Sequence, residues 1–286
     1  MPSVMNFLVA ESEPAAARQK RRESVGRSAG ETYVDLLRRL APDAKSDRIR
    51  PADGENAPTN LVGYDAVFVT GSPLHLYQET PQARREVEFM RAVFASGVPS
   101  FGSCAGLQVA TVAAGGTVRS MLNGHEAGFA RRISPTQVGR DHPMLAGRPD
   151  AFDAPAVHTD EVERLPEGAM LLASNSTTAV QAAEILSGSG VFWGVQYHPE
   201  ISLHEVAAAL RRDVDDLVSQ GFVDSRHTLD EHAELLEALH HHPDRRDLAW
   251  RLGLDEQVTD ATCRTRELAN FIELLVRPTR SARGRE

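Results

Sequence analysis

A cysteine flanked by glycines, between a strand-like and a helix-like segment, constrains the fold of this chain more than any other feature. Residues 98–116, VPSFGSCAGLQVATVAAGG, predict a short apolar strand, a sharp turn at Gly102-Ser103-Cys104-Ala105-Gly106, a helix of small residues and a double-glycine stop. Glycines on both sides permit a strained strand-to-helix turn, the geometry of a nucleophile elbow. Cys104 then projects at a helix N-terminus, where unpaired N–H groups favour the thiolate. The alternative is a buried structural cysteine in a glycine turn.

Up to residue 116 the chain alternates between strand-like and helix-like patterns. Apolar, β-branched runs predict strands at 4–10 and 64–69, and residues 45–50 predict a weak extended segment. A polar stretch ending at Pro42 carries apolar residues at helical spacing. Residues 80–96 predict an amphipathic helix with Thr80 as its N-cap and Pro81 in the first turn. Shorter strand-like pieces follow at 117–121, 130–138, 155–158, 169–174, 179–184 and 190–197. This order predicts an α/β fold with a mixed sheet flanked by helices.

From residue 204 onward the pattern is helical. Residues 204–219 predict one helix, and Thr228-Leu-Asp-Glu231 has the form of a capping box that opens a second. A third helix is predicted from about 256 to 276, stopping before Pro278. We therefore expect one α/β domain at residues 1–220 and a helical C-terminal extension at residues 221–286.

Charge and cysteine content exclude several classes of protein. The chain has 31 Lys and Arg against 40 Asp and Glu, a net charge of −9, which disfavours general nucleic-acid binding. No apolar run approaches the ~18 residues that span a bilayer, so no membrane segment is expected, and the first residues lack the features of a secretory signal. The only cysteines are Cys104 and Cys263, so we expect no disulfide framework and a reduced, cytoplasmic setting.

Two further stretches each allow two interpretations. Residues 18–39 carry seven basic side chains against three acidic ones, and we interpret them as a solvated helix face, with contact to an anionic ligand as the alternative. His240-His241-His242 suggests a metal site, but neighbouring helical positions cannot all face one ion. We expect neither a metal nor a cofactor.

A second reactive element ends an apolar strand at Gly194-Val-Gln-Tyr-His198-Pro-Glu200. Side chains two residues apart at a strand end point to the same side. Glu200 can then accept a hydrogen bond from one imidazole nitrogen of His198 while the other nitrogen faces Cys104. The alternative is a surface histidine in a turn.

A third element, Thr70-Gly71-Ser72-Pro73, closes the strand at 64–69. In an open α/β sheet, ligands bind at the carboxyl ends of the strands. A glycine turn at this position can offer backbone N–H groups to a developing oxyanion. The alternative is a plain turn after a strand.

Together, and in this order, the three elements resemble the class I glutamine amidotransferases, the family with a Cys-His-Glu triad. The matching pieces are the G-[GS]-P turn at 71–73, G-x-C-x-G followed by Leu107-Gln108, and the V-Q-Y-H-P-E strand end. Weaker matches are Glu126-Ala-Gly128 and His158-Thr-Asp160-Glu-Val162. The resemblance spans about residues 4–218 and is greatest to the branch of GMP synthase amidotransferase domains and γ-glutamyl peptidases. It implies an open, flavodoxin-like sheet.

The resemblance also implies roles for individual residues. They are Cys104 as the nucleophile, His198 as general base and acid, Glu200 as its orienting group, the backbone N–H groups of Ser72 and Ala105 as the oxyanion hole, and Gly71, Gln108 and Asp160 as substrate-binding residues. Ser72 is a departure, because many members have a second glycine there.

The implied activity is hydrolysis of the γ-amide of L-glutamine through a cysteine thioester, with ammonia passed to an unknown acceptor. About 65 residues follow the resembling region, too few for a synthetase domain, so a separate synthetase subunit or a second copy of this chain is the candidate partner. A first alternative is a γ-glutamyl peptidase or hydrolase that cleaves γ-glutamyl amides or peptides without a partner. A second is a non-catalytic binding or regulatory protein on the same fold.

Overall fold

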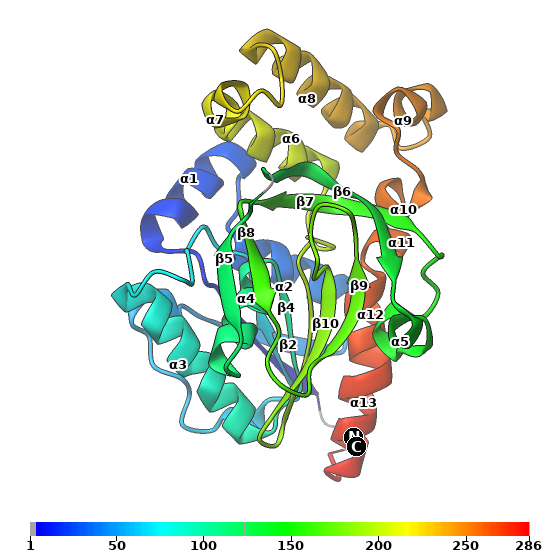
Figure 1. Cartoon of the computed structure of the whole chain (residues 1–286). Coiled ribbons are helices and arrows are strands. Elements are labelled where there is room, and N and C mark those ends of the chain that lie inside the picture. Colours follow the sequence, from blue (N-terminus) through cyan, green and yellow to red (C-terminus); the bar gives the residue numbers. More distant parts are fainter. Residues whose placement is uncertain (1–3, 123, 286) are drawn as a thin grey trace.

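The computed structural model describes residues 4–122 and 124–285, and a nine-stranded sheet forms its centre (Figure 1). The strands of this sheet are β1 Met5–Ala10, β2 Ala44–Ile49, β3 Ala66–Val69, β4 Ser100–Ser103, β6 Glu126–Pro135, β7 Phe152–His158, β9 Met170–Ser174, β10 Ala182–Ser187 and β11 Gly190–Val195. They lie in the order β2-β1-β3-β4-β11-β10-β9-β6-β7. The first five run parallel, and each of the remaining four is antiparallel to its neighbour. Two further strands, β5 Thr117–Ser120 and β8 Asp160–Arg164, form a separate antiparallel pair. The predicted α/β fold with a mixed sheet is confirmed.

Helices pack on both faces of the sheet, and some of those after residue 203 also pack on one another. They are α1 Ala15–Val25, α2 Ala29–Leu40, α3 Pro81–Ser96, α4 Ala105–Ala113, α5 Gln137–Asp141, α6 Leu203–Arg212, α7 Val214–Ser219, α8 Arg226–His241, α9 Arg246–Leu252, α10 Glu256–Thr259, α11 Ala261–Arg264, α12 Arg266–Phe271 and α13 Arg277–Ala282, with a π-helical segment at Ile272–Val276. Alternate residues of β1 serve different faces, because successive side chains of a strand point in opposite directions. Phe7 packs with α2 and α12, and Leu8 packs with α3 and α4.

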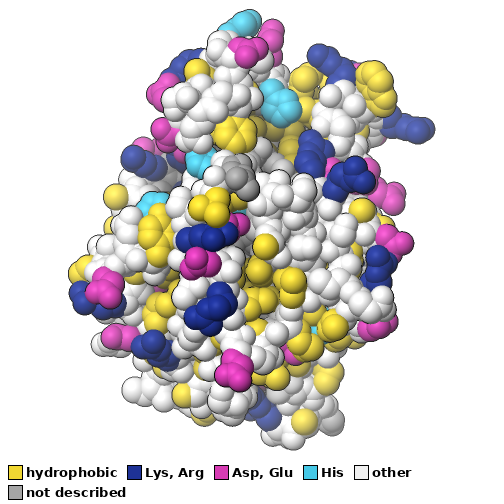
Figure 2. Space-filling view, viewed as in Figure 1, with side chains coloured by type: hydrophobic (Ala, Val, Ile, Leu, Met, Phe, Trp, Pro, Cys, Tyr) yellow, Lys and Arg dark blue, Asp and Glu magenta, His cyan; other side chains and the backbone are white. Residues whose placement is uncertain are grey.

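The surface carries charges of both signs. On the face shown in Figure 2, Lys and Arg side chains are interspersed with Asp and Glu, and neither sign forms a continuous stripe. This face therefore lacks the basic footprint that nucleic-acid binding uses. Within 4–122 and 124–285, no helix is both long enough and apolar enough to cross a bilayer.

Some helix boundaries agree with the local sequence patterns and others do not. The side chain of Thr80 accepts a hydrogen bond from the N–H of Ala83 and Pro81 opens α3, as predicted. The capping box predicted at Thr228 is wrong: Ser225 caps α8, one turn earlier. The predicted stop before Pro278 is also wrong, because helical backbone continues from the π-helical segment into α13, and Pro278 lies in the first turn of α13.

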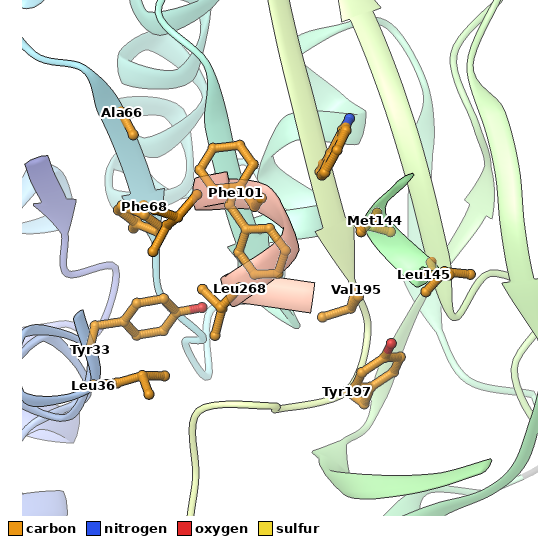
Figure 3. Close-up of a cluster of buried hydrophobic side chains, with 14 of the residues drawn as sticks. Tyr33, Leu36, Ala66, Phe68, Phe101, Met144, Leu145, Val195, Tyr197 and Leu268 are labelled. Atoms are coloured by element: carbon orange, nitrogen blue, oxygen red, sulfur yellow. The ribbon is translucent and has the colours of Figure 1, made fainter. Parts of the chain in front are cut away.

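The helices after residue 220 divide between two places. α8 and α9 pack on α6 and α7 in one apolar cluster. α12 instead returns to the central sheet, and Figure 3 shows its Leu268 in the same cluster as Phe68 and Phe101. The centroid of the Phe271 ring lies 5.5 Å from those of Phe68 and Phe101 and 5.9 Å from that of Trp193. The predicted division after residue 220 stays a prediction, but the last part of the predicted extension belongs to the core of the sheet.

A buried ion pair holds α12 in this position. Arg148 Nε lies 2.7 Å from Glu267 Oε1, and both side chains are completely buried. The hydroxyl of Tyr197 donates to the same oxygen at 2.7 Å. A buried pair without good geometry and extra hydrogen bonds would be costly, so these contacts specify where α12 docks.

Candidate active site

Cys104 lies at the tip of a strained turn between β4 and α4. Its φ of 52° and ψ of −110° are unusual for a residue with a side chain. A Cβ on Gly106 would lie 2.5 Å from the carbonyl oxygen of Val69, and one on Gly102 would lie 2.9 Å from the Gly106 backbone. The N–H of Cys104 donates to the carbonyl oxygen of Val195 at 2.8 Å. Both glycines are therefore needed for an elbow that presents Cys104 at the N-terminus of α4.

His198 follows β11 and is held against Glu200. Its backbone N–H donates to the carbonyl oxygen of Pro155 at 2.7 Å, and its Nδ1–H donates to Glu200 Oε1 at 2.6 Å. Burial lowers the pKa of His198, but the negative charges of Glu200 and Cys104, and hydrogen bonds with both, raise it to about 10. Because Nδ1 is committed to Glu200, Nε2 is the nitrogen that meets the Cys104 sulfur. At neutral pH this arrangement is an imidazolium beside a sulfur nucleophile.

The turn after β3 brings Gly71 and Ser72 beside the imidazole. A Cβ on Gly71 would lie 2.6 Å from His198 Cε1, so a side chain there would displace the ring. The Ser72 hydroxyl donates to the carbonyl oxygen of Ser12 at 2.8 Å and accepts from the N–H of Leu74 at 3.2 Å. These bonds anchor the turn to the chain that follows β1, and they explain how serine is accommodated at position 72.

Ala105, the other residue predicted for the oxyanion hole, is the first residue of α4. The first N–H groups of a helix have no acceptor within the helix. The N–H of Ala105 is thus directed out of the helix end next to Cys104, where an anion is favoured.

Replacing Gly71 by alanine should lower kcat by about 10- to 100-fold, because a small displacement of a catalytic group has effects of that size. The new Cβ meets His198, so the thermal unfolding temperature should change far less than the rate. Gly63→Ala is the matched control, since its Cβ would meet only the flexible end of the Asn60 side chain. Steady-state kinetics of the two variants would contradict this account if both kept the rate of the wild-type protein.

A cavity of about 700 Å³ lies over these groups. It is lined by seven of the eight residues that the sequence analysis assigned: Cys104, His198, Glu200, Gly71, Ser72, Gln108 and Asp160. Ala105 does not line it, which is compatible with a role for its backbone alone. The fold therefore brings together, from four separate segments, the residues that the resemblance selected.

Gln108 and Asp160 form one side of this cavity. Gln108 Nε2 donates to the carbonyl oxygen of Asp160 at 3.1 Å and to Gln196 Oε1 at 3.2 Å. Both amide protons are therefore used, and the Gln108 carbonyl oxygen is the atom left to accept from a ligand. The Asp160 carboxylate lies 2.7 Å from His75 Nδ1, on the loop after β3. Together these groups offer acceptors suited to an ammonium group.

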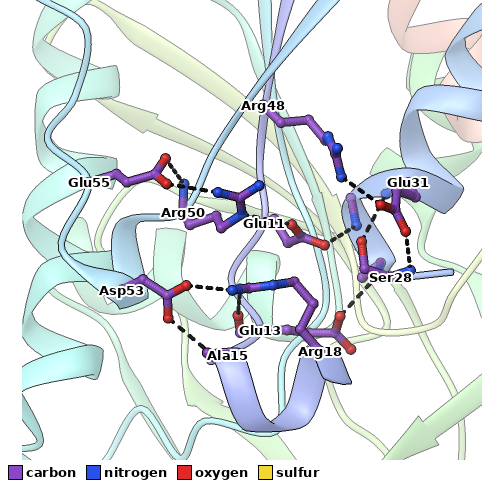
Figure 4. Close-up of polar contacts among 12 residues, drawn as sticks. Glu11, Glu13, Ala15, Arg18, Ser28, Glu31, Arg48, Arg50, Asp53 and Glu55 are labelled. Atoms are coloured by element: carbon purple, nitrogen blue, oxygen red, sulfur yellow. Dashed lines mark hydrogen bonds and ion pairs between the residues drawn. The ribbon is translucent and has the colours of Figure 1, made fainter. Parts of the chain in front are cut away.

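The opposite wall comes from α1, which the sequence analysis did not place at the site. Arg18 is buried, donating to Asp53 Oδ2 at 2.6 Å and to the carbonyl oxygen of Glu13 at 2.8 Å (Figure 4). Arg21 pairs with Glu205 at 3.0 Å, and Lys20 and Arg21 both line the cavity. The interpretation of this stretch as a solvated helix face is therefore wrong for Arg18 and Arg21. Their charged partners, Asp53 and Glu205, lie 35 and 184 positions away, so no local signal could have identified these ion pairs.

Comparison with known proteins shows which family this chain is similar to. The profile described as glutamine amidotransferase class-I matches residues 26–215. A γ-glutamyl-L-1-hydroxyisopropylamide hydrolase from a Pseudomonas species is 38% identical over 221 residues, which cover 76% of this chain and 75% of that protein. A glutamine-hydrolysing GMP synthase from Thiobacillus denitrificans is 31% identical over 186 residues.

The extent of these similarities differs. The GMP synthase match covers 60% of this chain but 33% of the synthase, so this chain spans about a third of that relative's length. Among solved structures, a glutamine amidotransferase from Thermotoga maritima superposes with a TM-score of 0.62 at 20% identity, covering 87% of this chain and 98% of that one. At that identity the superposition shows a shared fold and nothing further.

Proposed function

This chain belongs to the class I glutamine amidotransferase family, and we propose that it hydrolyses γ-glutamyl amide bonds, with L-glutamine and N-substituted γ-glutamyl amides as its substrates. The observation that carries the proposal is the pairing of Cys104, on its strained elbow, with the His198–Glu200 pair at the floor of one cavity. The Gly71-Ser72 turn beside them supports it, because acyl transfer needs donors near the reacting carbonyl.

The proposed reaction has two halves. The Cys104 sulfur bonds to the γ-carbonyl carbon, and the oxygen that becomes negative is held by the N–H groups of Ser72 and Ala105. The carbon–nitrogen bond then breaks as His198 Nε2–H gives its proton to the leaving nitrogen, which leaves a γ-glutamyl thioester. In the second half His198 takes a proton from water, the resulting hydroxide attacks the thioester, and glutamate departs as the thiolate returns.

Cavity size favours an amine larger than ammonia as one leaving group. A volume of about 700 Å³ falls in the range of roughly 300–1,000 Å³ that accommodates drug-sized ligands, well above what glutamine fills. The leaving nitrogen must lie within reach of His198. From there the cavity wall continues through Ile201 to α6, and α1 lines the cavity next to α6. α1 lies outside the region matched by the family profile. A substituent on the leaving nitrogen would therefore occupy the space between α1 and α6.

A second candidate function is supply of ammonia from glutamine to a synthetase. It is favoured by the GMP synthase relative, two thirds of which has no counterpart in this chain. A separate synthetase subunit would then supply the missing part, and a second copy of this chain, bound through the helical C-terminal extension at residues 221–286, is the other candidate partner. We also propose a cytoplasmic location, because Cys104 and Cys263 are both free thiols and the mechanism requires a reduced Cys104.

Substrate comparison tests the proposal. The purified protein is given L-glutamine, γ-glutamylethylamide and a γ-glutamyl dipeptide, and the released glutamate is measured. A glutamine analogue with a chloroketone in place of the carboxamide should label Cys104, as read by mass spectrometry. Cys263→Ala is the matched control and should remain active and labelled, whereas Cys104→Ala should be neither. Turnover that survives in Cys104→Ala would remove the proposal, and a non-catalytic binding protein would release no glutamate at all.

A further inference from the structure

The Glu200 carboxylate accepts two hydrogen bonds on the same oxygen. His198 Nδ1–H donates to Oε1 at 2.6 Å, and the Ser103 hydroxyl donates to the same Oε1 at 3.0 Å. The other oxygen, Oε2, is buried and has no hydrogen-bond partner within 4–122 and 124–285. The orientation of the carboxylate therefore depends on Ser103 as well as on His198.

Tyr33 extends this contact by one step. Its hydroxyl oxygen lies 2.7 Å from Ser103 Oγ, and neither residue has any exposed surface. A serine hydroxyl has one proton, and an ionised carboxylate only accepts. Since Ser103 donates to Glu200, Tyr33 must donate to Ser103. The four groups form a chain, Tyr33 to Ser103 to Glu200, with His198 donating from the other side, and such chains strengthen each member bond.

This chain of hydrogen bonds reaches Glu200 from the side that faces away from the cavity. Cys104 lines the cavity, whereas the preceding residue, Ser103, does not. Tyr33 comes from α2, and Figure 3 shows its hydroxyl pointing away from that helix toward the strands. Burial and the negative charge of Glu200 raise the pKa of Tyr33 well above its usual value, so this hydroxyl keeps its proton at every physiological pH.

From these contacts we propose that Ser103 and Tyr33 are positioning residues for the hydrolysis proposed above. They hold the Glu200 carboxylate so that Oε1, and not Oε2, meets His198. Neither touches substrate or the reacting atoms. Without Ser103 the carboxylate can rotate about its last bond, because Oε2 has no partner to resist the turn, and His198 loses the fixed direction in which it faces Cys104.

The test compares two buried serines of one strand. Ser103→Ala should lower kcat by about 10- to 100-fold with KM changed less than about threefold, the size expected for losing a hydrogen bond to a charged group in the transition state. Ser100→Ala is the matched control: Ser100 also lies in β4, is fully buried and donates to a backbone carbonyl oxygen. Its kcat should stay within about twofold of the wild-type value.

A double-mutant cycle separates positioning from general packing. Tyr33→Phe alone should lower kcat by about threefold to tenfold, because one weaker bond is lost. In the Ser103→Ala background the same change should have no further effect on kcat, since Tyr33 acts only through Ser103. The proposal would be overturned if Tyr33→Phe lowered kcat equally in the wild-type protein and in Ser103→Ala. It would also be overturned if Ser103→Ala lost thermal stability but kept its kcat.

A spectroscopic readout keeps the test independent of turnover. The Nδ1–H proton of His198, in a 2.6 Å bond, should give a downfield proton resonance that moves in Ser103→Ala and stays in Ser100→Ala. A wild-type protein that hydrolyses no γ-glutamyl compound would count against the proposed function, and this resonance would still decide the positioning role. An unmoved resonance in Ser103→Ala would overturn the positioning role alone.

Discussion

The Glu200→Gln variant should hydrolyse its substrate about 10⁴-fold more slowly than the wild-type protein, the scale on which a triad fails when its buried carboxylate loses its charge. Glutamine fills the same volume, so the fold should be retained. The charge that it lacks is what holds His198 protonated: burial lowers the pKa of His198, and Glu200 and Cys104 raise it to about 10. Without the Glu200 charge, the lowering of the pKa by burial is opposed less, and the pKa of His198 should fall toward or below 6.5.

The pH dependence follows with a definite sign. In the wild-type protein kcat/KM should decline on the alkaline side near pH 10, as the imidazolium that protonates the leaving nitrogen is lost. In Glu200→Gln this decline should move to lower pH by several units. A raised folded-state pKa also stabilises the fold fully below pH 6.5, and this contribution disappears as pH rises through about 10. The free energy of unfolding should therefore fall across that window in the wild-type protein and fall less in the variant.

Glu184→Gln is the matched control for both measurements. Glu184 Oε2 lies 3.2 Å from His142 Nε2, a second histidine–glutamate pair that does not line the cavity. Its loss should leave the alkaline decline of kcat/KM where it is. If Glu200→Gln kept a tenth of the wild-type activity, or if its alkaline decline did not move, the assigned role of Glu200 would be wrong.

Replacing Phe271 by alanine should lower the free energy of unfolding by about 3–5 kcal/mol, the usual cost of removing a buried aromatic side chain and leaving a cavity. Phe271 is completely buried and its ring contacts those of Phe68, Phe101 and Trp193. Leu274→Ala is the control in the adjoining π-helical segment, where Leu274 is 47% exposed. Its effect should stay below about 1 kcal/mol. Chemical denaturation measures both, and equal midpoints for the two variants would show that α12 is not part of the core.

This prediction also bears on how a partner should be sought. Deleting residues 221–286 would remove Phe271 and Glu267 along with the exposed helices, and it would leave Arg148 as an unpaired buried charge. Such a deletion would destabilise the fold, so a loss of partner binding could not be assigned to a lost docking surface. Substitutions on the exposed faces of α8 and α9 are the better probe, because the buried side chains of these helices belong to an apolar cluster separate from the one that holds Phe271.

The sequence was most informative where chemistry and geometry are encoded within a few residues. The glycines around Cys104 and the spacing of His198 and Glu200 are local patterns, so the elbow and the His198–Glu200 contact were predictable. The roles assigned to Ser72, Ala105, Gln108 and Asp160 stay predictions, although the fold gathers these residues at one place.

Features that depend on the order of strands were out of reach. Tyr33 was predictable as an apolar position of a helix, but its contact with Ser103 arises only because α2 packs on β1 and β2, on the face of the sheet that also carries Phe101. The pairing of Arg21 with Glu205 joins residues 184 positions apart. The return of α12 to the sheet likewise has no local signature, since the same amphipathic pattern is compatible with any apolar surface.

The position of α12 also determines when the protein can finish folding during its synthesis. Chains emerge from the ribosome N-terminus first, so β1, β3 and β4 appear long before residues 266–276. Until then the aromatic face made by Phe7, Phe68 and Phe101 lacks the helix that covers it. A nascent chain, or one that ends before Phe271, therefore presents an uncovered apolar surface, and premature termination before that residue should yield aggregates rather than a shortened enzyme.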